Sequence, residues 1–163
     1  MPSPARPSSK PATAGDDRIA GDLIADLFVG RILQGANPPG SRLTEREIAA
    51  VAGCTHARAR ETLHHLEKAG AVRMFRHRGA VVLGVEDAPP QEIDAIWSRL
   101  LALLESLAGH SLPRADPSLE PGARLAEETA QLDRLGALAG DAKLAGLLKR
   151  LALHRAIVTT RSA

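Results

Sequence analysis

Two helical segments follow each other with a very short connection, and this spacing constrains the fold more than any other feature of the sequence. The first segment starts at Thr44, which forms a capping-box pattern with Glu47. It stops at Gly53, and Thr55 is again a residue type that caps the N-terminus of a helix. The second helix ends near Gly70, because glycine readily adopts the left-handed conformation that closes helices. The sequence therefore predicts two short helices joined by a tight turn.

A β-hairpin is expected directly after the second helix. Residues 71–75 and 80–85 are short runs of residue types that favour strands. The connection between them, the wing tip, is basic and contains a glycine: Arg76, His77, Arg78 and Gly79. Two helices, a tight turn and a hairpin with a basic tip together describe a winged helix-turn-helix, in which the hairpin is the wing.

The sequence in front of these elements divides into a tail and one further helix. Residues 1–15 are rich in Pro, Ser, Ala and Thr and contain no acidic residue, so we expect a disordered tail. Asp16 or Asp17 is expected to cap a helix over residues 19–33, where apolar residues fall three and four positions apart. The predicted winged helix-turn-helix domain therefore covers residues 16–87.

The sequence after Pro89 and Pro90 predicts a small helical domain over residues 88–163. Apolar residues at helical spacing and a Pro-rich loop at 113–122 indicate three helices, at about 93–109, 123–138 and 142–159. Their apolar stripes have no large partner in so short a chain, so they are candidates for a dimer interface. The predicted fold class is mainly α: three helices and a wing, followed by a C-terminal helical domain.

Composition excludes several other classes of protein. Aromatic residues make up only 2% of the chain, so the core must consist of aliphatic side chains, and we expect Trp97 to be a packing residue. The single cysteine, Cys54, rules out an internal disulfide framework and fits a cytoplasmic location. We expect Cys54 to be a small buried residue; the alternative is a redox-sensing thiol.

The sequence carries no signature of an enzyme or a membrane protein. It contains no Gly-rich phosphate loop, no Cys-x-x-Cys and no His-Glu-x-x-His, so we expect no catalytic residues, no cofactor and no metal. Its apolar runs are shorter than the roughly 20 residues that span a bilayer, and its N-terminus lacks the apolar stretch of a secretory signal.

The start of the second helix is the part that would enter a major groove. Its N-terminal side chains must reach base edges and phosphates, and Thr55, His56, Arg58 and Arg60 occupy these positions. Arginine is the residue best suited to bidentate contact with guanine. Arg46, early in the preceding helix, can reach a neighbouring phosphate or groove. The wing tip would lie against an adjoining, narrower groove.

The charge distribution agrees with a nucleic-acid partner. Residues 42–78 contain eight Arg or Lys and four Glu, a net charge of +4, whereas the whole chain carries +2. Positive charge confined to one region is typical of proteins that bind the phosphate backbone. The alternative is a solvated surface on which Arg46 and Arg60 form ion pairs with Glu47 or Glu61.

These residues resemble the GntR family of bacterial repressors. Residues 40–55 (GSRLTEREIAAVAGCT) are similar to the family pattern G-x-x-L-x-E-x-x-L-A and the serine that opens its recognition helix. Residues 59–72 (ARETLHHLEKAGAV) are similar to the R-E-A-L-x-x-L-x-x-x-G-L-V stretch, and residues 78–82 (RGAVV) to its glycine-tipped wing. The resemblance extends over roughly 65 residues, from about 19 to 85.

The resemblance implies DNA contacts at the positions that match the family. These are the arginine of T-E-R-E, the residue that opens the recognition helix, the arginine of R-E-x-L and the wing glycine: Arg46, Thr55, Arg60 and Gly79. Two positions depart from the family, which usually has arginine at His56 and proline at Arg58. His56 can still hydrogen-bond to a base or phosphate, so the preferred DNA sequence is expected to differ.

Residues 97–108 and 138–148 resemble, more weakly, the all-helical FCD effector domain of one GntR subfamily. FCD domains commonly hold a metal through one Asp and three His within six or seven helices. Only His110 and His154 occur in this region, and Leu132 stands where one histidine would fall. We therefore expect a shortened, degenerate FCD-like region for dimerisation or effector binding, without the metal; whether it takes a small-molecule effector stays open.

The sequence thus predicts a sequence-specific transcriptional regulator that binds double-stranded DNA as a homodimer, on a short inverted repeat. A single recognition helix reads only a few base pairs, which is why a two-fold arrangement is expected. The alternative is a degenerate regulator that acts as a protein-interaction module without sensing a metabolite, which the changes at His56 and Arg58 would favour.

Overall fold

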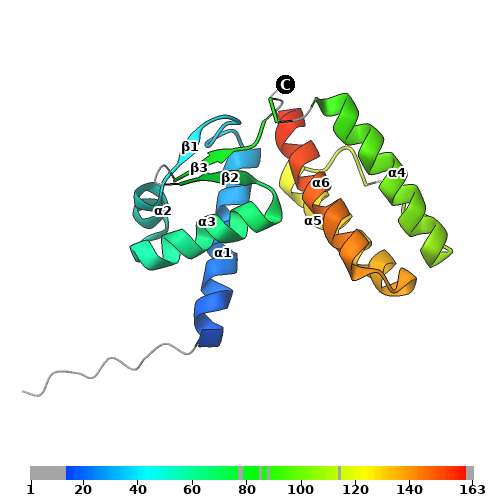
Figure 1. The fold of residues 1–163 in the computed structure, drawn as a ribbon, viewed down its shortest axis with the longest axis horizontal. Coiled ribbons are helices and arrows are strands. Elements are labelled where there is room, and N and C mark those ends of the chain that lie inside the picture. Colours follow the sequence, from blue (N-terminus) through cyan, green and yellow to red (C-terminus); the bar gives the residue numbers. More distant parts are fainter. Residues whose placement is uncertain (1–13, 77–78, 85, 88, 114, 161–163) are drawn as a thin grey trace, which may run out of the picture.

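The computed structural model describes residues 14–160 except residues 77, 78, 85, 88 and 114. The described residues form six helices and a three-stranded antiparallel sheet, in two parts that lie side by side (Figure 1). The N-terminal part contains α1 (Ala14–Leu33), β1 (Arg42–Leu43), α2 (Glu45–Ala52), α3 (His56–Ala69), β2 (Val72–Phe75) and β3 (Gly79–Val82). The C-terminal part contains α4 (Pro90–Ala108), α5 (Pro121–Ala139) and α6 (Ala142–Thr160). The expected fold class, a winged helix-turn-helix followed by a helical domain, is confirmed.

The two short helices start and stop where the capping signals predict. The Thr44 hydroxyl accepts a hydrogen bond from the Glu47 N–H at 3.2 Å, and the Thr55 hydroxyl accepts one from the Arg58 N–H at 3.3 Å. Gly53 and Gly70 follow the helices with φ of 62° and 83°, the left-handed region that favours glycine. Local sequence therefore fixes the length of α2 and α3.

The wing is a three-stranded sheet rather than the expected two-stranded hairpin. β3 lies in the middle, and β1 pairs with it on the side opposite β2. The register sets Arg42 of β1 and Arg73 of β2 opposite Val81 of β3. The strand expected at 80–85 runs only from 79 to 82, where its four residues pair with the four residues of β2.

The N-terminal helix starts earlier than expected. α1 begins at Ala14, so Asp16 and Asp17 lie within its first turn and do not precede it as caps. The last two residues of the expected tail, Ala14 and Gly15, are therefore helical, and residues 1–13 lie outside the described residues. Phe28 and Ile32 of α1 are fully buried in the core of the N-terminal part.

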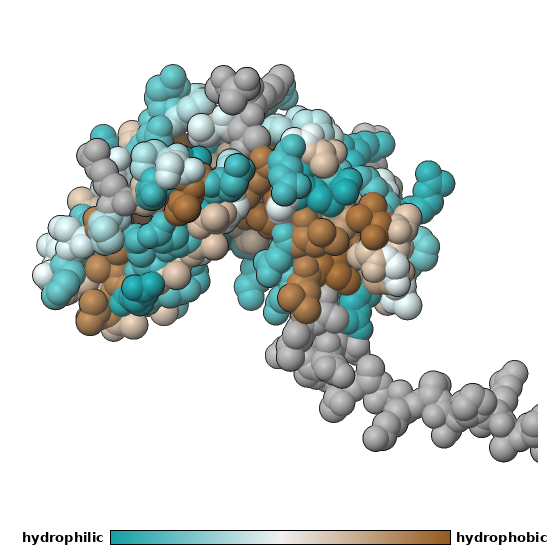
Figure 2. All heavy atoms as spheres, turned by 180° about the vertical axis from the view of Figure 1, so that it is seen from behind, coloured by the Kyte–Doolittle hydropathy of each residue, from teal (hydrophilic) through white to brown (hydrophobic). Residues whose placement is uncertain are grey.

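The C-terminal part is a bundle in which α4, α5 and α6 all contact one another. Ile93, Trp97 and Leu104 of α4 are buried, so part of the apolar stripe that was expected to lack a partner packs within the chain. Other leucines and one isoleucine of the bundle stay about half exposed: Ile96, Leu103, Leu107, Leu138 and Leu147. A second apolar surface lies on α1 just above the grey N-terminal residues in Figure 2, where Leu23 and Leu27 are exposed.

The bundle packs directly against the recognition helix α3. A methyl group added at Gly70, the C-cap of α3, would lie 3.5 Å from the backbone oxygen and the Cβ of Arg150 on α6. Buried residues of both parts, such as Leu63 of α3 and Leu148 of α6, belong to one continuous hydrophobic cluster. The two parts of the chain therefore share a single core.

Candidate nucleic-acid interface

The predicted contact elements lie together at the end of the N-terminal part that points away from the bundle. In Figure 1, α2, the first turn of α3 and the ends of β2 and β3 that meet at the wing tip are all on this side. The opposite end of α3 packs against α6. The fold thus places the start of α3 and the wing on the same side of the N-terminal part.

The recognition helix is held by one buried face, which leaves the other face free. Ala59, Leu63 and Leu66 are completely buried, and so is Thr62, whose hydroxyl donates to the Arg58 carbonyl at 3.0 Å. At the start of the helix His56, Ala57 and Arg60 are exposed, as is Thr55 at the cap, while Arg58 is half-buried. Of the four residues expected to reach into a major groove, three are therefore exposed and Arg58 is not.

Arg60 is paired on the protein surface with Glu45, and not with Glu47 or Glu61 as in the alternative interpretation. Its Nε donates to Glu45 Oε1 at 2.8 Å, which joins the recognition helix to the first residue of α2. The hydrogen bond and the charge of Glu45 raise the pKa of Arg60, so the guanidinium stays fully charged. Its side chain remains 67% exposed. Sequence reasoning missed Glu45, because the two residues are fifteen positions apart.

Arg46 and Glu47 point to different surroundings although they are neighbours. Arg46 is exposed on α2, as a phosphate contact requires. Glu47 Oε1 accepts a hydrogen bond at 2.9 Å from the buried Asn37, whose Oδ1 accepts from Arg31 Nε at 3.0 Å. These hydrogen bonds join α2 to the end of α1, and they involve the Glu47 carboxylate that the alternative interpretation paired with Arg46.

Gly79 has a structural reason to be glycine. Its φ is +76°, and an added Cβ would lie only 2.8 Å from the Leu43 carbonyl oxygen of β1. Arg76, at the end of β2, is exposed, while His77 and Arg78 lie outside the described residues. Arg73 is turned away from the wing tip, since its Nη2 lies 2.6 Å from Asp87 Oδ1. Among the described residues of the wing tip, Arg76 is therefore a candidate for contact with DNA.

Cys54 does not have the burial that was expected. It is half-buried in the turn between α2 and α3 and packs against the edge of the core. Its backbone N–H donates to the Ala49 carbonyl at 3.2 Å, which fixes the turn. The thiol is thus neither fully buried nor fully exposed.

The bundle contains a cavity of about 510 Å³ between α4, α5 and α6. Arg155 closes one side: its guanidinium lies 4.6 Å from the centre of the Trp97 ring, 2.7 Å from Asp94 Oδ1 and 3.5 Å from Glu128 Oε1. Burial raises the pKa of Glu128, against the opposing effect of Arg155 and of Arg124. The cavity lies in the size range of small-molecule sites.

The residues of the bundle do not fit the metal that the FCD resemblance implies. Leu132, which stands at a histidine position, is completely buried in the core. Across the described ranges, no group of three or more His, Cys, Asp or Glu is placed to hold a metal ion. None of the described helices is long and apolar enough to cross a membrane.

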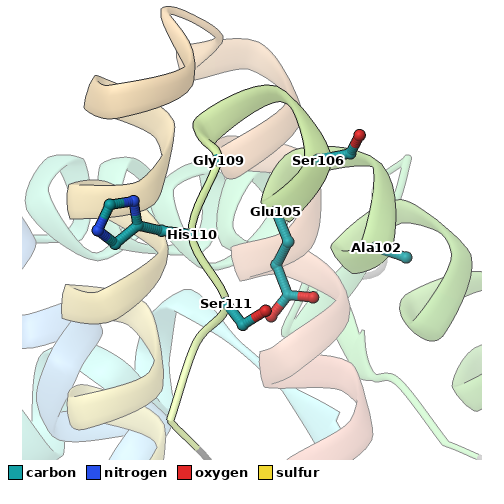
Figure 3. Close-up of a pocket in the computed structure, with 6 residues that line it drawn as sticks. All are labelled: Ala102, Glu105, Ser106, Gly109, His110 and Ser111. Carbon is teal, nitrogen blue, oxygen red and sulfur yellow. The ribbon is translucent and has the colours of Figure 1, made fainter.

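A second, smaller pocket of about 310 Å³ lies at the end of α4 (Figure 3). The side chains of Glu105 and Ser111 point toward each other there, whereas His110 points away from them. Glu105 Oε1 accepts a hydrogen bond from the Leu112 N–H at 2.7 Å. The carboxylate therefore holds the loop that follows α4, which accounts for it without a ligand.

Comparison with known proteins places the N-terminal part in a family. Residues 21–82 match the family model described as bacterial regulatory proteins, gntR family. This segment spans the whole helix-turn-helix and the sheet, from α1 to the end of β3. The N-terminal part thus resembles a GntR-type helix-turn-helix domain, which supports a DNA-binding transcriptional regulator.

Solved structures share the fold of both parts. A protein from Rhodococcus sp. RHA1 described as a transcriptional regulator GntR superimposes with a TM-score of 0.55 at 18% identity, over 86% of this chain and 74% of that one. McbR/YncC of E. coli gives a TM-score of 0.53 at 18% identity, over 83% of this chain and 71% of its own. No curated protein matches the sequence significantly.

Proposed function

We propose that this chain is a sequence-specific transcriptional regulator that binds double-stranded DNA through the first turns of α3. The observation that carries the proposal is the set of exposed side chains at the start of a GntR-type recognition helix, Thr55, His56 and Arg60. α2 and the wing flank this helix on the same side of the domain (Figure 1). Such a regulator would act on chromosomal DNA in the bacterial cytoplasm, without catalysis.

The contacts divide into base readout and anchoring. Arg60 is the candidate for a bidentate contact with guanine, and Thr55 and His56 for hydrogen bonds to a base or a phosphate. Arg46 is the candidate anchor on the phosphate backbone, with Arg58 beside the recognition surface. Arg76, together with His77, Arg78 and Gly79 of the wing tip, would lie along the neighbouring groove.

We further propose that two copies bind a short inverted repeat. Phosphate contacts and one recognition helix give limited specificity, and a two-fold pair doubles the number of bases read. The half-exposed apolar side chains of α4, Ile96, Leu103 and Leu107, support association of the C-terminal parts. The C-terminal region would then serve as a shortened, FCD-like dimerisation region; an effector stays a prediction.

Selection of bound sequences from random double-stranded DNA tests the proposal. We expect an enriched inverted repeat, bound with an affinity that falls steeply as salt concentration rises. Arg60→Ala should weaken binding to that repeat by at least tenfold, because a bidentate base contact is lost. The matched control is Arg134→Ala, an exposed arginine on α5 that lies outside the interface. Binding without any preferred sequence would instead favour a protein-interaction module.

A further inference from the structure

We propose that Glu45 is a positioning residue that sets base discrimination by holding the Arg60 guanidinium in one orientation. This inference rests on the proposed function, since it concerns how the same interface reads DNA. Glu45 is the first residue of α2, and its carboxylate reaches across to the exposed face of α3 to accept the Arg60 Nε–H at 2.8 Å.

The geometry leaves Arg60 one edge with which to meet a base. A guanidinium carries five N–H donors, one on Nε and two on each terminal nitrogen. Two parallel N–H donors are needed for the O6 and N7 atoms of guanine. Because Glu45 occupies the Nε–H, the remaining edge with parallel donors is formed by the two terminal nitrogens. Glu45 thus selects which edge of Arg60 faces the groove.

The pair also reduces the number of conformations that Arg60 samples before DNA arrives. A free, exposed arginine loses rotamer freedom when it binds, and a side chain already held in place loses less. Arg60 is 67% exposed and Glu45 is 29% exposed, so Glu45 is the better-fixed partner. The capped start of α2, where Thr44 accepts the Glu47 N–H, fixes its backbone.

Glu45 should improve discrimination between sequences, but as a carboxylate at a DNA interface it should also lower the affinity for DNA. Its charge repels phosphates, so it weakens binding to any sequence. Removing Glu45 should therefore strengthen non-specific binding while it weakens discrimination between sequences. This opposite movement separates a positioning role from a merely structural one, in which both affinities would fall together with the melting temperature.

The test measures dissociation constants of the full chain for the selected repeat and for the same DNA with the guanine positions changed. Glu45→Ala should tighten binding to the changed DNA and lower the ratio between the two affinities by about tenfold. Glu45→Gln removes the same charge but keeps an oxygen acceptor for the Arg60 Nε–H. We expect it to restore the ratio to within about threefold of wild type.

The matched control is Glu61→Ala, which removes a carboxylate from the exposed face of α3 next to Arg60. It should tighten binding to both DNAs equally and leave their ratio unchanged. An unchanged ratio in Glu45→Ala, or the same loss of ratio in Glu61→Ala, would overturn the inference while leaving the proposed function intact. A wild-type chain with no preferred sequence would overturn both.

Discussion

Gly136, in the last turn of α5, lies where α5 and α6 approach each other closely. Gly136 is buried, and a Cβ added there would lie 2.6 Å from the Cβ of Ala145 on α6. Carbon atoms in contact normally lie about 3.5–4.0 Å apart. The Ala145 Cβ is fixed to the backbone of α6, so the two helices would have to separate by about 1 Å.

Two opposing effects decide whether Gly136→Ala raises or lowers the free energy of unfolding. Alanine is favoured over glycine inside a helix by about 1 kcal/mol. Overpacking of a well-filled core costs about 1–3 kcal/mol, and a contact as short as this one belongs at the upper end. We therefore expect Gly136→Ala to lower the free energy of unfolding by about 2 kcal/mol. For a chain of this length the melting temperature should fall by about 4–8 °C.

Gly146 on α6 provides the matched control, because it has no neighbour within 4 Å that an added methyl group would meet. Gly146→Ala should raise the free energy of unfolding by up to about 1 kcal/mol through helix propensity alone. Adding Ala145→Gly to Gly136→Ala should return most of the lost stability, once the cost of the new glycine is subtracted. Urea unfolding followed by circular dichroism measures the three variants against wild type. Equal stability of the Gly136→Ala and Gly146→Ala proteins would refute the reasoning.

Three further predictions concern the wing, the hydrogen bonds behind α2 and the bundle. Gly79→Ala should reduce stability by about 2 kcal/mol and weaken DNA binding, because φ is +76° and the added Cβ meets a backbone oxygen of β1; thermal unfolding and DNA titration check both. Asn37→Ala should cost about 1–3 kcal/mol in urea unfolding, since Arg31 and Glu47 both lose a hydrogen-bond partner. Burial raises the pKa of Glu128 in the folded chain, so its contribution to stability should be largest below the unfolded value of roughly 4.3 and be lost as pH rises through the folded value. Melting curves between pH 4 and 7 should show this fall in wild type and lack it in Glu128→Gln.

The elements whose signals are local were predictable from the sequence. Thr44, Thr55, Gly53 and Gly70 act on backbone groups a few residues away, and the structure confirms the two helices that they delimit. β1 was not predictable, because two residues carry no periodic pattern and owe their strand conformation to β3. The predicted start of α1 was also wrong: the two aspartates expected to cap the helix lie inside its first turn.

The candidate interface shows the same division. His56 and Arg60 were expected to be accessible because they lie at the N-terminal end of the second helix, and both are exposed. The partner of Arg60 could not be predicted from the sequence, because Glu45 comes close only through the packing of α2 on α3. Sequence alone offered Glu47 and Glu61, but the Glu47 carboxylate accepts a hydrogen bond from Asn37 instead.

Because Gly70 at the end of α3 packs against Arg150 on α6, we expect the stability of the recognition helix to depend on the C-terminal part of the chain. Because one hydrophobic cluster runs through both parts, heating should melt them in a single cooperative transition. A fragment that ends near Pro89 would uncover the side of α3 that rests on the bundle. A fusion of the N-terminal part to another effector domain would therefore have to include α6, or a surface of similar shape, to cover this side of α3.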